Sequence, residues 1–402
     1  MKKYKLGEIA KEVSSGATPS RNKLTYWENG NIPWLKTEQI GQYRIKNTNE
    51  HISQQAVKET ALKLYPKNTI SIAMYGEGRT RGNVSITDCE LTTNQACCNI
   101  VVDNDIVEPF YLYYFLKTQY QNFRNLSSGI RKNLNTNIIK NYDIYLPSKE
   151  KQIKVSNFLK SIDDKIAINN QINELLERVA KAIYEYYFVQ FDFPNKQGQP
   201  YKSSGGAMRF DPTLNRPIPK DFEVKKLADI IIKNTKKAEK DNKKSLIDLS
   251  VMPQNTFCLN LNNIGDAFNT NLFEMQKFDI LFGSIRPYLK KAGFAPFDGL
   301  VTGTIHSVKP INPNFFNFIL LTLTHKSFFD YAVSVSKGTK MPIIGYEELS
   351  DFKIPFNESI IEKFNTILNF KEIISNNIIQ NQKLKNLRDF LLPLLINAQV
   401  QI

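Results

Sequence analysis

Apolar and polar residues follow a helical period along two long stretches of the chain. The first stretch, 150–189, contains no Pro or Gly, and the second covers residues 358–398. The apolar positions are Ile162, Ile166, Leu176, Val179 and Ile183 in the first stretch, and Phe370, Ile374, Leu384, Leu387 and Leu391 in the second. This spacing predicts two long amphipathic helices. Because each apolar stripe needs a partner, we expect the helices to pack antiparallel on each other as a coiled coil.

One heptad position in each stretch defines the predicted seam between the helices. It is occupied by Ile162, Asn169, Leu176 and Ile183 in the first stretch, and by Phe370, Asn377, Leu384 and Leu391 in the second. A single Asn at an apolar seam position fixes the register of paired helices at some cost in stability. The alternative is two unrelated solvent-facing helices, in which the matching Asn positions would be a coincidence.

The segments that precede the helices also repeat, at offsets of about 208 to 220 residues. Residues 4–9 return as 224–230, the strand-like run 68–74 returns as 278–282, and residues 143–147 return as 351–355. We therefore predict an α+β fold in which two globular domains alternate with two long helices, with an internal pseudo-twofold repeat. The expected parts are a globular domain at 1–148, a helix at 149–190, a linker at 191–222, a second globular domain at 223–356 and a second helix at 357–402.

Composition restricts the class of protein further. The 402 residues are 42% hydrophobic, and 53 Lys and Arg against 39 Asp and Glu give a net charge of +14. This content of apolar residues excludes general disorder. Four Cys residues without a CxxC motif exclude a secreted disulfide scaffold, and no apolar run reaches the roughly 18 residues that span a bilayer. We expect a soluble, cytoplasmic protein with a polyanionic partner.

The strongest local concentration of charge lies between the two repeats. Residues 196–244 contain 13 Lys and Arg against 6 Asp and Glu, together with many Gly, Pro and Ser residues. The segment is either a solvated linker with a loop or a direct contact to phosphates.

Motifs for catalysis do not occur in the sequence. There is no GxxxxGK[ST] loop for a nucleotide, and the glycines at 76–82 are followed by a strand-like run, whereas a dinucleotide fold requires a helix there. His51, His306 and His325 lie far apart in the sequence, so neither a metal site nor a His-dependent triad is predicted. We expect no enzymatic activity in this chain.

Two pairs of basic loops at equivalent places in the repeats predict a nucleic-acid interface instead. They are 75–83 with 283–291, and 128–133 with 337–341. Glycine lets backbone approach a ligand closely, Arg can bind guanine bidentately, and Lys contacts phosphate. The alternative is hairpin tips whose charges are only solvated. The candidate DNA contacts are Thr18, Ser20, Arg21, Lys36, Tyr75, Arg79, Arg81, Asn94, Arg131, Lys132, Asn133, Ser284, Arg286, Tyr288, Lys290, Lys291, Lys337, Thr339 and Lys340.

Several strings resemble the specificity subunits of Type I restriction-modification systems. The segment 188–194, continuing through 200–206 to 218–219, is similar to the junction after the first helix in that family, and residues 92–97 and 279–288 resemble its target recognition domains. The resemblance covers essentially the whole chain. The two copies of the reading loops differ greatly from each other, so individual base contacts do not transfer.

The resemblance implies a non-catalytic subunit in host defence. Each globular domain would read one half of a split, asymmetric DNA site, while the helices set the spacing and dock two methyltransferase subunits. Restriction and translocase subunits would complete the complex, and S-adenosylmethionine, ATP and Mg²⁺ would belong to those partners. The alternatives are a helical scaffold for protein assembly and a stand-alone DNA methyltransferase.

Overall fold

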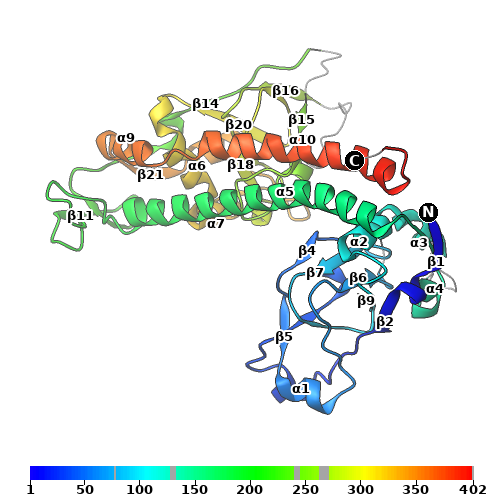
Figure 1. Ribbon diagram of the computed structural model, residues 1–402. Helices are drawn as coiled ribbons and strands as arrows, with labels where there is room; N and C mark the ends of the chain where they lie inside the picture. The colour runs from blue at the N-terminus through cyan, green and yellow to red at the C-terminus, as the bar shows by residue number, and fades with distance from the viewer. Residues whose placement is uncertain (77, 127–132, 240–244, 262–270, 401–402) are drawn as a thin grey trace. The chain divides into compact units, whose positions relative to one another are not determined.

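The computed structural model describes residues 1–76, 78–126, 133–239, 245–261 and 271–400. The chain forms two compact units, the first comprising residues 1–164 with 384–402 and the second residues 165–383. Each unit contains one globular domain and part of both long helices (Figure 1). The predicted α+β fold of two globular domains and two long helices is thus confirmed.

A five-stranded sheet is the framework of the first globular domain. Its strands are, in spatial order, β2 (Ala10–Ser15), β9 (Cys97–Val102), β6 (Ile70–Ala73), β7 (Val84–Thr87) and β4 (Arg44–Ile45). A smaller sheet consists of β5 (Glu50–Ile52), β3 (Ile32–Leu35) and β8 (Thr92–Thr93). Strand β1 (Lys2–Lys5) pairs antiparallel with β10 (Asp143–Leu146), so the chain enters and leaves this domain side by side. The helices of the domain are α1 (Gln54–Glu59), α2 (Pro109–Thr118), α3 (Tyr120–Leu126) and α4 (Thr136–Lys140).

The second globular domain repeats most of the main sheet of the first. Its main sheet has the order β14 (Ile231–Lys233), β20 (Ile305–Pro310), β17 (Ile280–Gly283) and β18 (Ala292–Phe294). The smaller sheet consists of β15 (Leu246–Ile247), β19 (Gly299–Thr302) and β16 (Leu272–Met275), and β13 (Glu223–Lys226) pairs with β21 (Lys353–Phe356) as β1 does with β10. Its helices are α6 (Phe316–Thr324), α7 (Lys326–Val335) and α8 (Tyr346–Ser350). The repeat in the sequence therefore corresponds to the same order of four strands in the two main sheets. The smaller sheets differ, because their central strand is β3, the first along the chain, in one domain and β19, the last along the chain, in the other.

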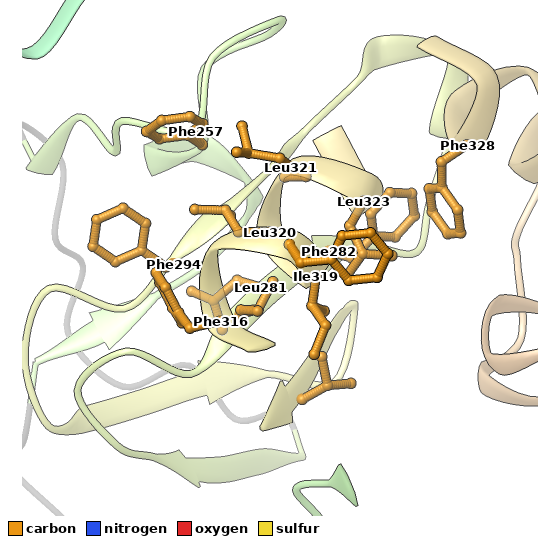
Figure 2. Packing of buried hydrophobic residues seen from close by; sticks show 14 of the residues in the cluster. Phe257, Leu281, Phe282, Phe294, Phe316, Ile319, Leu320, Leu321, Leu323 and Phe328 are labelled. Atoms are coloured by element: carbon orange, nitrogen blue, oxygen red, sulfur yellow. The ribbon is translucent and has the colours of Figure 1, made fainter. Parts of the chain in front are cut away.

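Helix α6 lies in the core of the second domain. It is predominantly apolar, and every residue from Phe316 to Leu323 is buried. Figure 2 shows Phe316 beside Phe294 of β18, with ring centroids 5.7 Å apart, and Phe282 of β17 facing Phe328 at 5.2 Å. Truncating a buried Phe of this kind to Ala costs about 3–5 kcal/mol. In the first domain α2 has the same role, with its residues from Phe110 to Leu116 buried.

The first long helix agrees with its prediction. Helix α5 extends from Lys149 to Tyr184 and continues as a π-helical turn, Glu185–Val189. No Gly or Pro interrupts it, so the backbone hydrogen bonds run unbroken through 36 residues of α-helix.

The second long helix differs from its prediction, because it is divided. Helix α9 (Glu358–Ile367) ends at Leu368, which has an extended backbone, and α10 (Lys371–Ile396) begins three residues later. The side chain of Asn317 donates to the Leu368 carbonyl at 2.8 Å, and Phe370 stacks on Phe257 at 5.4 Å. These tertiary contacts stabilise the break, which the helical pattern did not reveal.

The basic segment between the repeats is folded where the structure describes it. Strands β11 (Met208–Asp211) and β12 (Arg216–Pro219) form a hairpin. The Arg216 guanidinium donates to the Phe188 carbonyl at 3.2 Å, and Arg209 donates to the Phe222 carbonyl at 2.8 Å. These two arginines therefore hold the hairpin against the end of α5 and the start of the second domain.

Candidate nucleic-acid interface

The second globular domain places its two basic loops side by side. The first follows β17 and contains Arg286, and the second follows α7 and contains Lys337. The Arg286 amide donates to the Pro342 carbonyl at 2.7 Å, while Lys337 and Ile343 exchange two backbone hydrogen bonds of 2.9 Å. Both loops thus contribute to one surface of this domain.

The tips of these loops expose the side chains that could contact DNA. Arg286 is exposed and left-handed (φ 51°), and Tyr288 is 51% exposed in the single helical turn that follows. Lys290 is half-buried and also left-handed (φ 52°). Thr339 and Lys340 are exposed beside Gly338, whose φ of 101° favours glycine in this turn.

Two candidates in the same loops form hydrogen bonds within the chain, Ser284 and Lys291. Ser284 is 4% exposed, and its hydroxyl donates to the Thr304 carbonyl at 2.8 Å. The Lys291 ammonium donates to the Leu249 carbonyl at 2.5 Å. Both residues were predicted as DNA contacts from the composition of the loops alone, and composition does not distinguish the base of a hairpin from its tip.

The equivalent loop of the first domain connects β6 to β7, as the sequence predicted for a hairpin. Tyr75 and Arg79 are exposed, and Arg81 is half-buried. Helix α3 supports the loop, because the Tyr120 hydroxyl donates to the Arg79 carbonyl at 3.0 Å and Arg124 donates to the Gly78 carbonyl at 2.5 Å.

The second basic loop of the first domain is described only at its end. Arg131 and Lys132 lie outside the described residues, and Asn133 is half-buried. The next residue, Leu134, donates its amide to the Met74 carbonyl at 3.1 Å. The corresponding bond in the second domain joins Ile344 to Ser284 at 3.0 Å, so the loops occupy equivalent positions in both domains.

The remaining candidates of the first domain lie around a pair of tryptophans. The Arg21 guanidinium lies 3.6 Å from the ring centroid of Trp27, and both Arg21 and Lys36 form ion pairs of 2.5 Å with Glu50. Hydrogen bonds from Arg21 and then Lys36 hold the pKa of Glu50 below its usual value. These two cations are therefore already paired within the chain.

Thr18, Ser20 and Asn94 complete that set. Thr18 donates to the Gln95 side chain at 2.5 Å, and Ser20 is exposed. The Asn94 side chain accepts a hydrogen bond of 3.1 Å from the Ala96 amide, so it closes a turn. A role of Asn94 as a base reader is not needed to explain its position.

Cations that are exposed or half-buried and have no internal partner are the strongest candidates for contacts to an anion. Over the residues that the structure describes, Arg79, Arg286, Lys290 and Lys340 form no ion pair. Lys337, by contrast, lies 2.6 Å from Glu348, which raises its pKa by hydrogen bonding. We therefore regard the four unpaired cations as the core of the candidate interface.

The seam between α5 and α10 contains a ladder of asparagines in the second unit. Asn169 donates to Gln380 at 2.7 Å and to Asn381 at 2.9 Å, and Asn377 donates to Asn173 at 2.8 Å. Because higher residue numbers on one helix meet lower numbers on the other, the helices are antiparallel there, as predicted. The two helices run side by side in Figure 1.

Sequence reasoning identified half of this ladder. It named Asn169 and Asn377 but not their partners Asn381 and Asn173, which lie four residues after each seam Asn. The four residues form two contacts of the same kind, since Asn173 and Asn381 are also 208 residues apart. The sequence signal that could have revealed both partners is the repeat of polar residues at positions of the helix that the helical period places in the buried seam.

The other seam predictions are met to different degrees. Ile162 and Phe370 are buried, and Leu176, Ile183, Leu384 and Leu391 are half-buried. Val179 and Leu387, which the apolar pattern included, are 50% and 45% exposed and lie outside the seam. In the first unit the seam contains a buried ion pair, Arg388 with Asp163, and the Tyr114 hydroxyl donates to Asp163 at 2.8 Å.

The described part of the chain contains neither a cluster of metal-binding side chains nor a helix that could cross a membrane. No group of three or more His, Cys, Asp or Glu residues there could hold a metal ion. The three histidines have separate local partners, Asn47 for His51, the Ile344 carbonyl for His306, and Glu185 with Ser327 for His325. A search of the same residues for a helix that could cross a membrane found none.

Comparison with known proteins finds similarity to the family that the sequence resembles. Residues 1–178 match the model of the Type I restriction modification DNA specificity domain. The Type I restriction enzyme MjaIX specificity subunit of Methanocaldococcus jannaschii is 27% identical over 415 residues, covering 97% of this chain and 91% of the relative. The resemblance to Type I specificity subunits is confirmed.

Further similarities agree with it. The EcoR124I/EcoR124II specificity subunit of Escherichia coli is 26% identical over 200 residues, or 48% of each chain. The crystal structure of the Type I restriction-modification S subunit from M. genitalium has a TM-score of 0.63 and 16% identity, and covers 98% of this chain and 95% of the other. At that identity the structural likeness establishes the fold.

Proposed function

We propose that this chain is the DNA specificity subunit of a Type I restriction-modification complex and that it has no catalytic activity of its own. The observation that carries the proposal is the duplication of one basic hairpin site. The main sheets of both domains share the order of four equivalent strands, and each domain exposes an Arg, Arg79 or Arg286, after the equivalent strand. Two sites of one kind fit a DNA target in two parts.

The two sites should read different sequences. The main sheets share the order of four equivalent strands, but the loop around Arg79 contains three glycines, whereas the loop around Arg286 contains Pro287 and Tyr288. Base readout depends on the donor and acceptor groups that reach the major groove. We therefore propose a split, asymmetric target, one half for each domain, with the two helices setting the gap between the halves.

The surface of the helices supports a role in docking methyltransferase subunits. Ile168, Ile172, Leu175 and Val179 recur at helical spacing on α5 and are 36–50% exposed. On α10, Leu387 and Phe390 are 45% and 68% exposed. Exposed apolar side chains in line on one helix are a typical protein-binding surface.

Chemistry would reside in the partner subunits. We propose that S-adenosylmethionine is bound by the methyltransferase subunits, and ATP and Mg²⁺ by the restriction and translocase subunits. Because its substrate would be chromosomal DNA, we place the chain in the cytoplasm. The relatives found are specificity subunits, and none of them favours a helical scaffold or a stand-alone methyltransferase.

Methylome sequencing tests the proposal directly. Cells would express this chain together with the methyltransferase subunit encoded beside it, and a matched strain would express the methyltransferase alone. We expect one split motif with two different halves in the first strain and no motif in the second. Methylation by the methyltransferase alone, or identical half-sites, would contradict the proposal.

A further inference from the structure

A buried carboxylate on α5 holds a loop of the second globular domain. Glu177 is 7% exposed and accepts hydrogen bonds from the hydroxyl of Thr256 and, at 3.2 Å, from the amide of Phe257. Its carboxylate also lies 2.6 Å from the ammonium of Lys181, which donates to the Asn255 carbonyl at 3.1 Å. Two residues one turn apart on the helix thus fix three consecutive residues of the loop.

The same loop supports the candidate reading loop. The Asn255 amide donates to the Lys290 carbonyl at 3.1 Å. Farther back along the chain, the Leu249 carbonyl accepts from Lys291. A continuous set of hydrogen bonds therefore leads from Glu177, through residues 255–257, to the end of the loop that exposes Arg286.

The first unit contains a similar arrangement on the same helix. The Tyr43 hydroxyl donates to Asp164 at 3.3 Å, and Arg44 lies 3.8 Å from that carboxylate. The neighbouring residues Gly41 and Gln42 bond to the hydroxyl of Ser85, at 2.9 and 2.8 Å. Ser85 lies in β7, the strand that follows the loop of Arg79.

We propose that Glu177 and Asp164 are positioning residues for base readout, each acting on its own globular domain through the loop that it holds. The inference rests on the proposed function and extends it to residues that do not touch DNA. A bidentate Arg contact depends on a narrow geometry, so a reading loop must be held to within about 0.5 Å. Loss of the carboxylate should therefore reduce selectivity before it abolishes binding.

The test uses the complex of the full chain with its methyltransferase subunits. Methylation rates are measured on the cognate site and on sites with one changed base in either half, and Arg79→Ala and Arg286→Ala identify which half each domain reads. The variants are Glu177→Ala, Glu177→Gln, Asp164→Ala and Thr256→Val. Glu174→Ala, at an exposed position one turn earlier on α5, is the matched control.

We expect Glu177→Ala to lower discrimination on the order of tenfold in the half-site of the second domain only. Asp164→Ala should affect only the other half-site, by a smaller factor, because its contacts are longer and more exposed. Glu177→Gln keeps an acceptor for the Phe257 amide and should restore most of the discrimination. Thr256→Val, which leaves the helix intact, should reproduce part of the Glu177→Ala effect.

The outcomes separate the two hypotheses. A wild-type complex that methylates no split site would overturn the proposed function itself. If the wild type is selective but Glu177→Ala and Thr256→Val keep full discrimination, the positioning role is wrong. Equal loss in both half-sites would also refute it, since that pattern indicates general destabilisation. If Glu177→Ala does not fold, Thr256→Val and Asp164→Ala decide the question.

Discussion

The antiparallel pair of α5 and α10 should act as a ruler between the two half-sites. In the second unit Asn169 faces Asn381 and Asn173 faces Asn377. The same register places Ile168 opposite Gln382. A heptad inserted between Ala167 and Ile168, with a second between Gln382 and Lys383, lengthens both helices at one level. The asparagine ladder stays intact, because both insertions lie on the same side of it.

The size of the effect follows from helix geometry. Seven residues add about 10 Å at 1.5 Å per residue. At about 3.4 Å per base pair, the gap between half-sites should grow by about three base pairs, or by one to two if DNA bending or twisting absorbs part of the change. The bases read on either side should stay the same, since no residue of the globular domains is altered.

The assay is methylome sequencing of cells that express the lengthened chain with its methyltransferase subunits. A control variant carries the α5 heptad after Arg178 instead of Ala167, which lengthens the helices equally but moves Asn169 and Asn173 away from Asn381 and Asn377. Leaving buried amides unpaired costs about 1–3 kcal/mol each, so the control should have a lower thermal unfolding temperature than the matched variant. If the matched variant folds and its target keeps the original gap between half-sites, the helices do not set that gap, and docking of partner subunits would be their remaining proposed role.

Four further predictions follow from the site and the seam. Arg286→Ala or Arg79→Ala should cost about 1–3 kcal/mol of binding free energy and relax one half-site only, whereas uniform weakening on all DNA in a binding assay would make these residues phosphate contacts. The purified chain should bind DNA with a steep salt dependence, and methyl transfer by the chain alone with S-adenosylmethionine would disprove the absence of catalysis. Arg388→Ala leaves Asp163 buried without its cation and should destabilise the first unit by about 3–5 kcal/mol in denaturant unfolding, part of which Asp163→Asn should restore. Burial lowers the pKa of His306, so as the pH falls below the ordinary value of about 6.5 the unfolded chain binds the proton first and the folded state loses stability. His306→Gln should reduce this loss when thermal unfolding is measured between about pH 5 and 8. An unchanged dependence of stability on pH would exclude His306 as the source of the loss.

The fold could be predicted from the sequence because its main signals are periodic and occur twice. The uninterrupted pattern of 150–189 predicted α5 almost to the residue, and the internal repeat predicted two related globular domains, whose main sheets share the order of four strands. The break at Leu368 could not be predicted in this way. It depends on Asn317 and Phe257, which are distant in the sequence and become neighbours only after folding.

The candidate site was predictable by region but not by residue. Loop composition located both basic hairpins, and Arg79 and Arg286 are exposed as expected. Whether a polar residue points to solvent depends on its place within the hairpin, so the internal hydrogen bonds of Ser284 and Lys291 could not be predicted from composition. Arg21 and Lys36 show the same limit, because Glu50, which pairs with both, comes from another strand of the sheet.

The exposed residues Val179 and Leu387 bear on the proposed docking of partner subunits. Both fit the apolar pattern of a helix, and both are about half exposed at positions 208 residues apart. A buried seam alone would not place apolar side chains outside it at the same point of both repeats. A partner that binds each helix in the same manner gives a reason for this, since burying such a side chain stabilises a complex by about 25 cal/mol per Å² of apolar surface. The docking of two methyltransferase subunits that we propose requires a repeated surface of this kind.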